Sequence, residues 1–154
     1  MKLIRASRNR LSFHLRQPEK QVLLRVLRLY PRVPPAHHQL SRSSPSPNPQ
    51  ENQRLLDQAL AEQRAENTRQ VQALLTDRGR LEEVRDGWRL SISRAEADWL
   101  LQVLNDIRVG SWVALGSPDE LPVNLDEKTA PDYWAMEMAG FFQMHLLHAL
   151  NPAP

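Results

Sequence analysis

Two histidines near the end of the chain, His145 and His148, lie three residues apart, which on a helix places both imidazoles on one face. Such a pair can bind one metal ion when carboxylates of a Glu-x-x-His pattern on facing helices complete the site. Neither histidine has a glutamate three residues before it, and a second pair, His37 and His38, lies among prolines. The sequence therefore predicts no metal site, and we expect surface or hydrogen-bonded histidines.

Other motifs that carry chemistry are missing from the sequence. The chain has no cysteine, which excludes disulfides, thiolate metal sites, iron–sulfur clusters and cysteine nucleophiles. Its five glycines fall in neither GxGxxG nor GxxxxGK[ST] spacing. No serine lies in the G-x-S-x-G pattern of a nucleophile elbow. We predict no catalytic residue and no cofactor, and an enzyme is the least favoured class of function.

Two charged residues fall on apolar faces of predicted helices. Arg108 lies towards one edge of an apolar face, where a guanidinium must either extend to solvent or find a carboxylate. Glu137 lies on the last helix, which is apolar nearly all round. These positions suggest a buried ion pair between Arg108 and Glu137.

The net charge of +2 conceals an uneven distribution. Residues 1–49 hold ten basic residues and one acid, Glu19, for a charge of +9, whereas residues 50–154 hold ten basic and seventeen acidic residues, for −7. A nucleic-acid-binding surface is one interpretation, and it would use Arg5, Arg8, Arg10, Arg16, Arg25, Arg28 and Arg32. The favoured interpretation is that the basic third packs on the acidic remainder of the same chain or of a second copy, because its charges are spaced singly among apolar residues.

An internal repeat organises the elements that position these residues. Residues 9–30 match residues 86–107 after a shift of 77 positions, and both stretches have a strand-then-helix pattern. Five residues recur unchanged: Glu19, Leu23, Leu24, Val26 and Leu27 return as Glu96, Leu100, Leu101, Val103 and Leu104. In the second unit, Ser93 and Glu96 have the spacing of a capping box at the start of the helix.

The remaining pattern completes an α+β fold. We expect strands at 2–6, 11–15 and 88–92, and helices at 18–30, 50–76, 94–115 and 129–150. Residues 31–49 carry six of the twelve prolines and read as a linker.

We predict a single domain over residues 1–154 with four helices and a small antiparallel sheet. Repeat unit one is 9–30, the proline-rich linker 31–49, repeat unit two 86–107 and the C-terminal core helix 129–150. The two units should lie side by side about a pseudo-two-fold axis, with the last helix packed on both. No run of 18 apolar residues and no signal-peptide pattern occur, so we expect a cytoplasmic protein without membrane contact.

The stretch from Asp98 to Val109, with Gly110 after it and the later Leu115-Gly116, resembles a block of an uncharacterised bacterial family, the domain of unknown function numbered two thousand and seventeen. Residues 10–30 and 133–150 are similar to other blocks of that family, and the similarity covers about half of the chain. The resemblance implies no activity or catalytic residue. Family genes often lie beside that of the Clp protease adaptor, and some members are labelled transcriptional regulators, which favours a regulatory or interaction role.

We therefore predict a protein-interaction or regulatory module with a protein partner, and a homodimer through an apolar helix is a further expectation. The alternative function is nucleic-acid binding by the basic third. Asn105 and Asp106, a polar pair inside the distinctive block, are the expected surface interaction residues; two solvated helix residues are the simpler interpretation.

Overall fold

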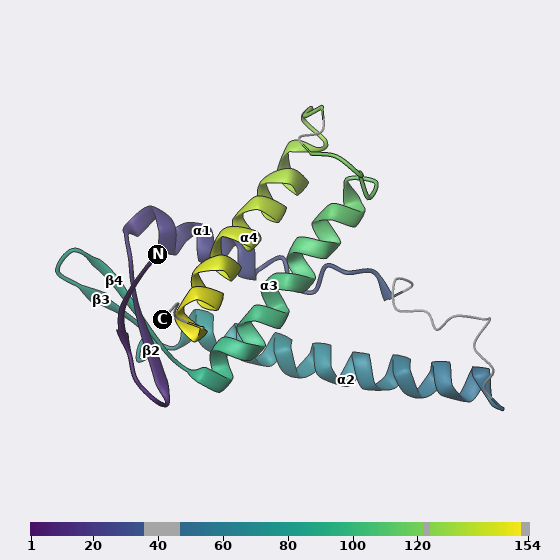
Figure 1. The fold of residues 1–154 in the computed structure, drawn as a ribbon, viewed down its shortest axis with the longest axis horizontal. Helices are drawn as coiled ribbons and strands as arrows, with labels where there is room; N and C mark the ends of the chain where they lie inside the picture. The colour runs from purple at the N-terminus through teal and green to yellow at the C-terminus, as the bar shows by residue number, and fades with distance from the viewer. Residues whose placement is uncertain (36–46, 122–123, 152–154) are drawn as a thin grey trace.

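The computed structural model describes residues 1–35, 47–121 and 124–151 (Figure 1). Its elements are β1 (Lys2–Ala6), β2 (Arg10–Leu15), α1 (Gln17–Leu27), α2 (Pro49–Thr76), β3 (Leu81–Val84), β4 (Gly87–Ser93), α3 (Arg94–Ala114) and α4 (Ala130–Leu150). Most of the predicted proline-rich linker, including His37 and His38, lies outside the described residues.

The strands form one antiparallel sheet in the order β1-β2-β4-β3, which confirms the α+β class. The two strands of the internal repeat are direct neighbours. Phe13 pairs with Leu90, and Leu11 pairs with Ile92. Phe13 and Leu90 are themselves equivalent after the shift of 77, so the two strands are related by a two-fold axis through this pair.

Strand β3 was not among the strands predicted from the sequence. This strand is short and lies at the sheet edge, where its central residues Glu82 and Glu83 are both exposed. Val84 is its single β-branched residue and it has no aromatic residue, so it offers little of the composition on which strand prediction depends. The Asp86-Gly87 dipeptide was an available signal, because Asp-Gly is typical of tight hairpin turns and Gly87 has a φ of 145°.

Helices α1 and α3 repeat each other in register. They start at Gln17 and Arg94, which are 77 residues apart. The predicted capping box is confirmed, since the Glu96 backbone amide donates to Ser93 Oγ at 3.0 Å and the Ser93 amide donates to Glu96 Oε2 at 2.8 Å. The equivalent Glu19 accepts from the Arg16 amide at 2.8 Å. Both helices bury corresponding residues: Leu23, Val26 and Leu27 in α1, and Leu100, Val103 and Leu104 in α3.

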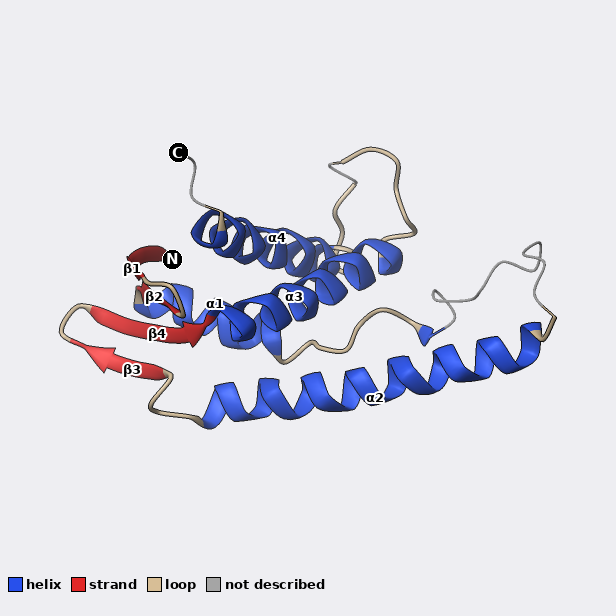
Figure 2. Cartoon of the chain, turned by 60° about the horizontal axis from the view of Figure 1, so that its bottom comes forward, coloured by secondary structure: helices blue, strands red, loops and turns tan. Residues whose placement is uncertain are grey.

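One face of the sheet supports the core. Alternate residues of β2 and β4 are buried beneath the helices, whereas the residues between them face solvent. The helices gather on one side of the sheet (Figure 2). Helix α4 packs along α3 and also contacts α1 and β1. The largest fully buried side chains include Phe13 and Phe142.

Helix α2 has a docked half and a projecting half, and we call the projecting first half the arm (Figure 2). Its second half enters the core through Val71 and Leu74, and Asn67 is the third buried residue of the helix. Its first half extends away from the other helices (Figure 2). The helix is therefore only partly buried, because Asn67 docks on the body while the first half projects (Figure 2).

Candidate functional site

A groove of about 600 Å³ opens where α2 and α3 diverge. Its walls come from both helices, and the segment after α1 contributes the rest. The lining residues are Tyr30, Val33, Leu60, Gln63, Arg64, Asn67, Gln102, Asn105, Asp106 and Val109. The predicted pair Asn105 and Asp106 thus lines this groove. The α2 wall was not among the predicted interaction residues. Gln63 and Asn67 were a signal for it, because they are polar residues on the side of α2 that carries Leu60 and Val71.

Asp106 has a structural role at the groove. Its Oδ1 accepts hydrogen bonds from the backbone amides of Arg32 at 2.6 Å and Val33 at 3.2 Å. These bonds hold the segment after α1 against α3. The approach is close, since a Cβ added at Gly110 would lie 2.5 Å from the Arg32 carbonyl carbon. Asp106 therefore positions one wall of the groove through its Oδ1.

Most other polar groups of the groove also bond to one another. Gln63 donates to Gln102 at 2.9 Å, and Asn67 donates to the Tyr30 hydroxyl at 3.3 Å. Arg64 donates to the Val33 carbonyl. Burial raises the pKa of Tyr30 and keeps its hydroxyl protonated. The polar groups thus hold the groove walls together.

Asn105 lies at the exposed rim. Its side-chain oxygen accepts from Arg108 at 3.1 Å and lies 3.5 Å from Gln143 Nε2 of α4. These contacts are at the surface, so Asn105 is accessible in a way that Asp106 is not.

The predicted buried ion pair between Arg108 and Glu137 is wrong, because both side chains are exposed. Arg108 instead passes over Gly140, where an added Cβ would lie 3.7 Å from Arg108 Cδ, and its guanidinium reaches Asn105. A long side chain at the edge of an apolar face can bury its stem and keep its charge in water. That outcome needs no carboxylate partner.

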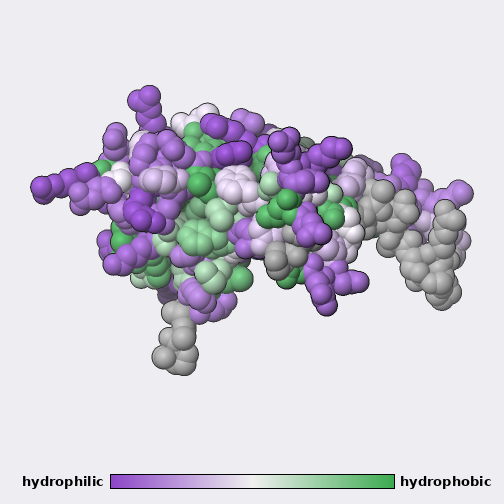
Figure 3. Space-filling view, turned by 90° about the horizontal axis from the view of Figure 1, so that it is seen from above, coloured by the Kyte–Doolittle hydropathy of each residue, from purple (hydrophilic) through white to green (hydrophobic). Residues whose placement is uncertain are grey.

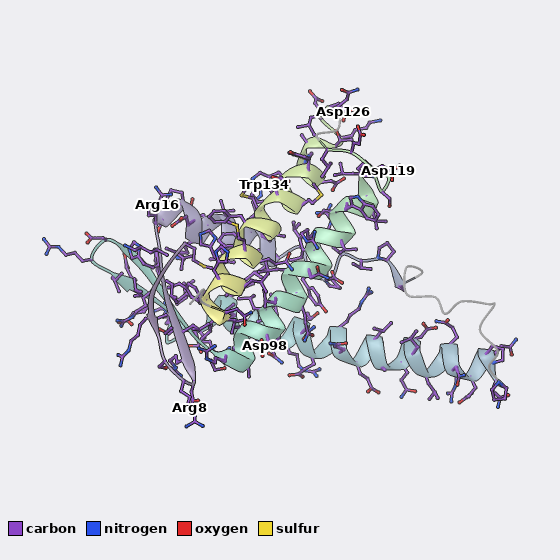
Figure 4. All side chains as sticks on the ribbon, viewed as in Figure 1. Arg8, Arg16, Asp98, Asp119, Asp126 and Trp134 are labelled. Atoms are coloured by element: carbon purple, nitrogen blue, oxygen red, sulfur yellow. The ribbon has the colours of Figure 1, made fainter. Side chains whose placement is uncertain are left out.

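The seven arginines proposed for nucleic-acid binding do not share one surface. Arg8 lies at the tip of the β1–β2 hairpin, whereas Arg16 lies at the opposite end of β2 (Figure 4). Arg32 is half-buried and pairs with Asp132, and Arg25 lies over the Trp134 ring at 4.4 Å. The remaining three, Arg5, Arg10 and Arg28, are exposed.

The other predicted contact, between the basic third and the acidic remainder, is sparse. Among the described residues, the ion pair of Arg32 with Asp132 is the single salt bridge that joins residues 1–35 to the rest of the chain. Glu19 of the same third takes up the Met1 amino group and Arg16. Most of the positive charge of this third is therefore not neutralised by the remainder.

The histidine pair of α4 does not converge on a metal. His145 lies against the Phe141 ring with a centroid distance of 4.3 Å, and its Nδ1 lies 2.9 Å from the Phe141 carbonyl oxygen. His148 is exposed. Within the described part of the chain, no three histidine, aspartate or glutamate side chains cluster as metal ligands would.

Apolar side chains also reach the surface in scattered positions. Leu121 and Leu125 of the α3–α4 connection are exposed, as are Met144 and Leu147 of α4. Figure 3 looks onto the end of the molecule that carries this connection, and its hydrophobic side chains are separated by hydrophilic ones. Among the described residues, these four exposed apolar side chains come from two separate elements, the connection and α4.

Comparisons with known proteins identify no relative. No family model matches the chain, and no match occurs among the curated proteins or the solved structures. The resemblance to the bacterial family therefore stays a prediction. None of the described helices is long and apolar enough to cross a lipid bilayer.

Proposed function

We propose that this chain is a protein-interaction module with a regulatory role, and that the groove between α2 and α3 receives a helical segment of a partner protein. The observation that carries the proposal is the projecting half of α2 beside an open groove. An apolar stripe on this half lies in line with the side chains that dock the second half on the body. The stripe has no partner in the described structure.

The stripe has the chemistry of a helix-binding surface. Leu56 and Leu60 are half-exposed and follow one another at i and i+4 towards the buried Asn67 and Val71. Leu55 beside them is 51% exposed. Amphipathic helices dock in such grooves through apolar residues at spacings of three and four. Leu60 and Val109 would supply the apolar contact on opposite walls.

A small-molecule site is less well supported. Ligand pockets of that kind carry a few polar groups that converge on the ligand. Here Gln63, Asn67 and Asp106 already bond to neighbouring protein groups. The amide of Asn105 at the rim can still contact a partner segment.

The family resemblance suggests the cellular process in which the partner acts. The genes of that family often lie beside the gene of the Clp protease adaptor, so regulated proteolysis is the process in which we would first look for the partner.

The test is affinity capture of the full-length tagged protein from its own cell extract, with a 260/280 nm absorbance reading before mass spectrometry. The wild type is compared with Leu56→Glu/Leu60→Glu in the stripe. Met144→Glu/Leu147→Glu on α4 is the matched control, because it places the same two charges on exposed apolar residues elsewhere.

We expect one stoichiometric protein at a protein-like absorbance ratio, retained by the wild type and the control and lost from the stripe variant. Circular dichroism must first show that all three proteins melt alike. Equal recovery with all three would place the binding surface elsewhere. If the captured protein is a second copy of this chain, and only the stripe variant fails to capture it, the groove forms a homodimer contact and does not bind a different protein.

A further inference from the structure

The outer face of the sheet, which no helix covers, carries aligned polar and basic residues. Because paired residues of adjacent strands point to the same face, the register defines its members. One row across the four strands is Lys2, His14, Arg89 and Glu82, and the next is Arg5, Ser12 and Ser91. Arg10 and Ser93 form the third, and Val84 and Gly87 form a short row at the opposite end. We call this set the outer sheet face.

The positive charge of this face is mostly uncompensated. Arg89 pairs with Glu82 at 2.5 Å. Lys2, Arg5 and Arg10 are exposed and form no ion pair with any described residue. Four basic residues and one acid give the face a charge of +3, and Arg8 extends beside it at the hairpin tip (Figure 4). A solvated sheet face alone would not require this excess of one sign.

The polar residues between the charges suit a phosphate ligand. Ser12 and Ser91 lie opposite each other, with their hydroxyl oxygens 3.3 Å apart, in the middle of the face. Arginine, lysine and serine side chains are among the groups that commonly contact nucleic-acid phosphates. The outer sheet face contains no phenylalanine, tyrosine or tryptophan. Proteins that bind single strands stack bases on such rings, so this face favours a duplex.

The width of the sheet also agrees with a duplex. Four strands about 4.8 Å apart span roughly 14 Å. The basic residues of the face lie on β1, β2 and β4, which span roughly 10 Å of that width. The major groove of B-DNA is about 12 Å wide, so these long side chains can reach phosphates on both of its edges. We propose that the outer sheet face binds the phosphate backbone of double-stranded nucleic acid without reading its sequence. This proposal is independent of the groove between α2 and α3.

The experiment is fluorescence anisotropy of a labelled duplex of about 20 base pairs, titrated with the full chain between about 50 and 200 mM salt. The test variant is Arg5→Ser/Arg10→Ser. The control is Arg54→Ser/Arg69→Ser, which removes the same charge from exposed positions on α2 (67% and 69% exposed).

We expect the test variant to bind at least tenfold more weakly at the lowest salt. Its slope of log affinity against log salt should fall by about 2, since each neutralised phosphate contributes about 0.9. The control should change affinity by less than about threefold and keep the slope, because its charges lie off the face. If the test variant proves unstable, Arg8→Ser in the hairpin turn provides the second measurement, with a smaller loss of the same sign.

Several outcomes would overturn the proposal. Equal losses of duplex affinity in the test and control variants would mean that the protein attracts the duplex by its net charge alone. Tighter binding of a single strand of the same length would contradict the proposal that the face binds double-stranded nucleic acid. Absence of duplex binding at low salt would also reject the proposal. In that case, loss of phosphatidylserine-vesicle binding in the test variant would assign the face to a membrane surface, and loss of polyglutamate binding to an acidic protein.

Discussion

At the scale of single residues, the adjacent Asn105 and Asp106 have different roles. Asp106 accepts two backbone amides from the segment after α1 and is half-buried. Asn105 faces solvent and contacts only side chains. An acceptor that satisfies backbone amides contributes more to stability than an exposed amide, because its loss leaves the donors without a partner.

Asp106→Ala should therefore lower the free energy of unfolding by about 1–3 kcal/mol. Asn105→Ala should change it by less than about 0.5 kcal/mol. Urea denaturation of both variants gives the comparison. Equal effects would mean that the two amide bonds to Asp106 do not hold the segment in solution.

Folding lowers the pKa of the Glu19 carboxyl group. Burial acts to raise the pKa of its carboxyl group, but hydrogen bonds from the Met1 amino group and the Arg16 amide outweigh burial. The pKa falls from 4.5 to about 2. A pKa that is lower in the folded state means that the carboxylate stabilises the fold above pH 4.5, and that this stabilisation is lost as the pH falls towards 2.

Glu19→Gln should cost about 1–2 kcal/mol at neutral pH, a value reduced for partial solvent screening. The difference from the wild type should shrink as the pH falls from 4.5 to about 2. Thermal melts across this range provide the measurement. A difference that stays constant with pH would show that packing, and not the charge, accounts for the cost.

At the scale of elements, the packing of α3 depends on a glycine. The backbone at Arg32 approaches α3 so closely that a methyl group at Gly110 would overlap the Arg32 carbonyl. Gly140 of α4 is a contrasting case, because its nearest neighbour would be the flexible Arg108 stem at 3.7 Å.

Gly110→Ala should destabilise the protein by at least about 1 kcal/mol, since the overlap outweighs the better helix propensity of alanine. Gly140→Ala should stabilise by about 0.5–1 kcal/mol for that same propensity. Chemical denaturation distinguishes the signs. Stabilisation by both alanines would mean that the segment at Arg32 is not packed on α3.

The two halves of α2 differ in what supports them. Pairs within the helix, such as Glu51 with Arg54 at 2.7 Å, support the projecting half. Each such pair contributes only a few tenths of a kcal/mol. The docked half gains burial at Val71 and Leu74. A helical segment without tertiary packing is marginal in water.

We expect backbone amides at 51–60 to exchange with deuterium at least tenfold faster than those at 69–75. Mass spectrometry of peptic fragments reports both segments in one experiment. Saturating amounts of a partner captured through the groove should slow exchange in 51–60. Uniform protection in the free protein would mean that the arm is already covered.

At the scale of the whole molecule, the duplicated strand–helix unit builds the centre of the fold. Antiparallel pairing of Phe13 with its own equivalent Leu90 places the two units about a two-fold axis. Helices α1 and α3 then bury matching leucines in one core with α4. Neither unit has a complete core alone, so both should matter equally to stability.

Leu27→Ala and Leu104→Ala, at equivalent positions with no exposed surface, should each cost about 2–5 kcal/mol. Leu55→Ala on the exposed arm should cost less than about 0.5 kcal/mol. Denaturant unfolding measures all three. A much smaller loss at Leu27 than at Leu104 would show that the first unit is peripheral to the core.

Much of this architecture could be predicted because its signals are local or repeated. The alternation in β2 and β4, the capping box at Ser93 and the prolines that delimit helices each act over a few residues. The shift of 77 residues added a long-range pairing that local patterns alone do not reveal. Strand β3 was not predicted, because an edge strand with exposed glutamates has no apolar alternation.

The amino-acid sequence by itself determined the α+β class, the pairing of the duplicated units and the absence of the common catalytic motifs. The tertiary structure alone decided which side chains meet. A helical wheel gives the direction of Arg108 and Asp106, but it cannot show which element, if any, lies opposite. Arg108 therefore reaches solvent over Gly140, and Asp106 meets two backbone amides. The groove and the outer sheet face likewise depend on where neighbouring elements end, because exposure is a property of the assembled chain.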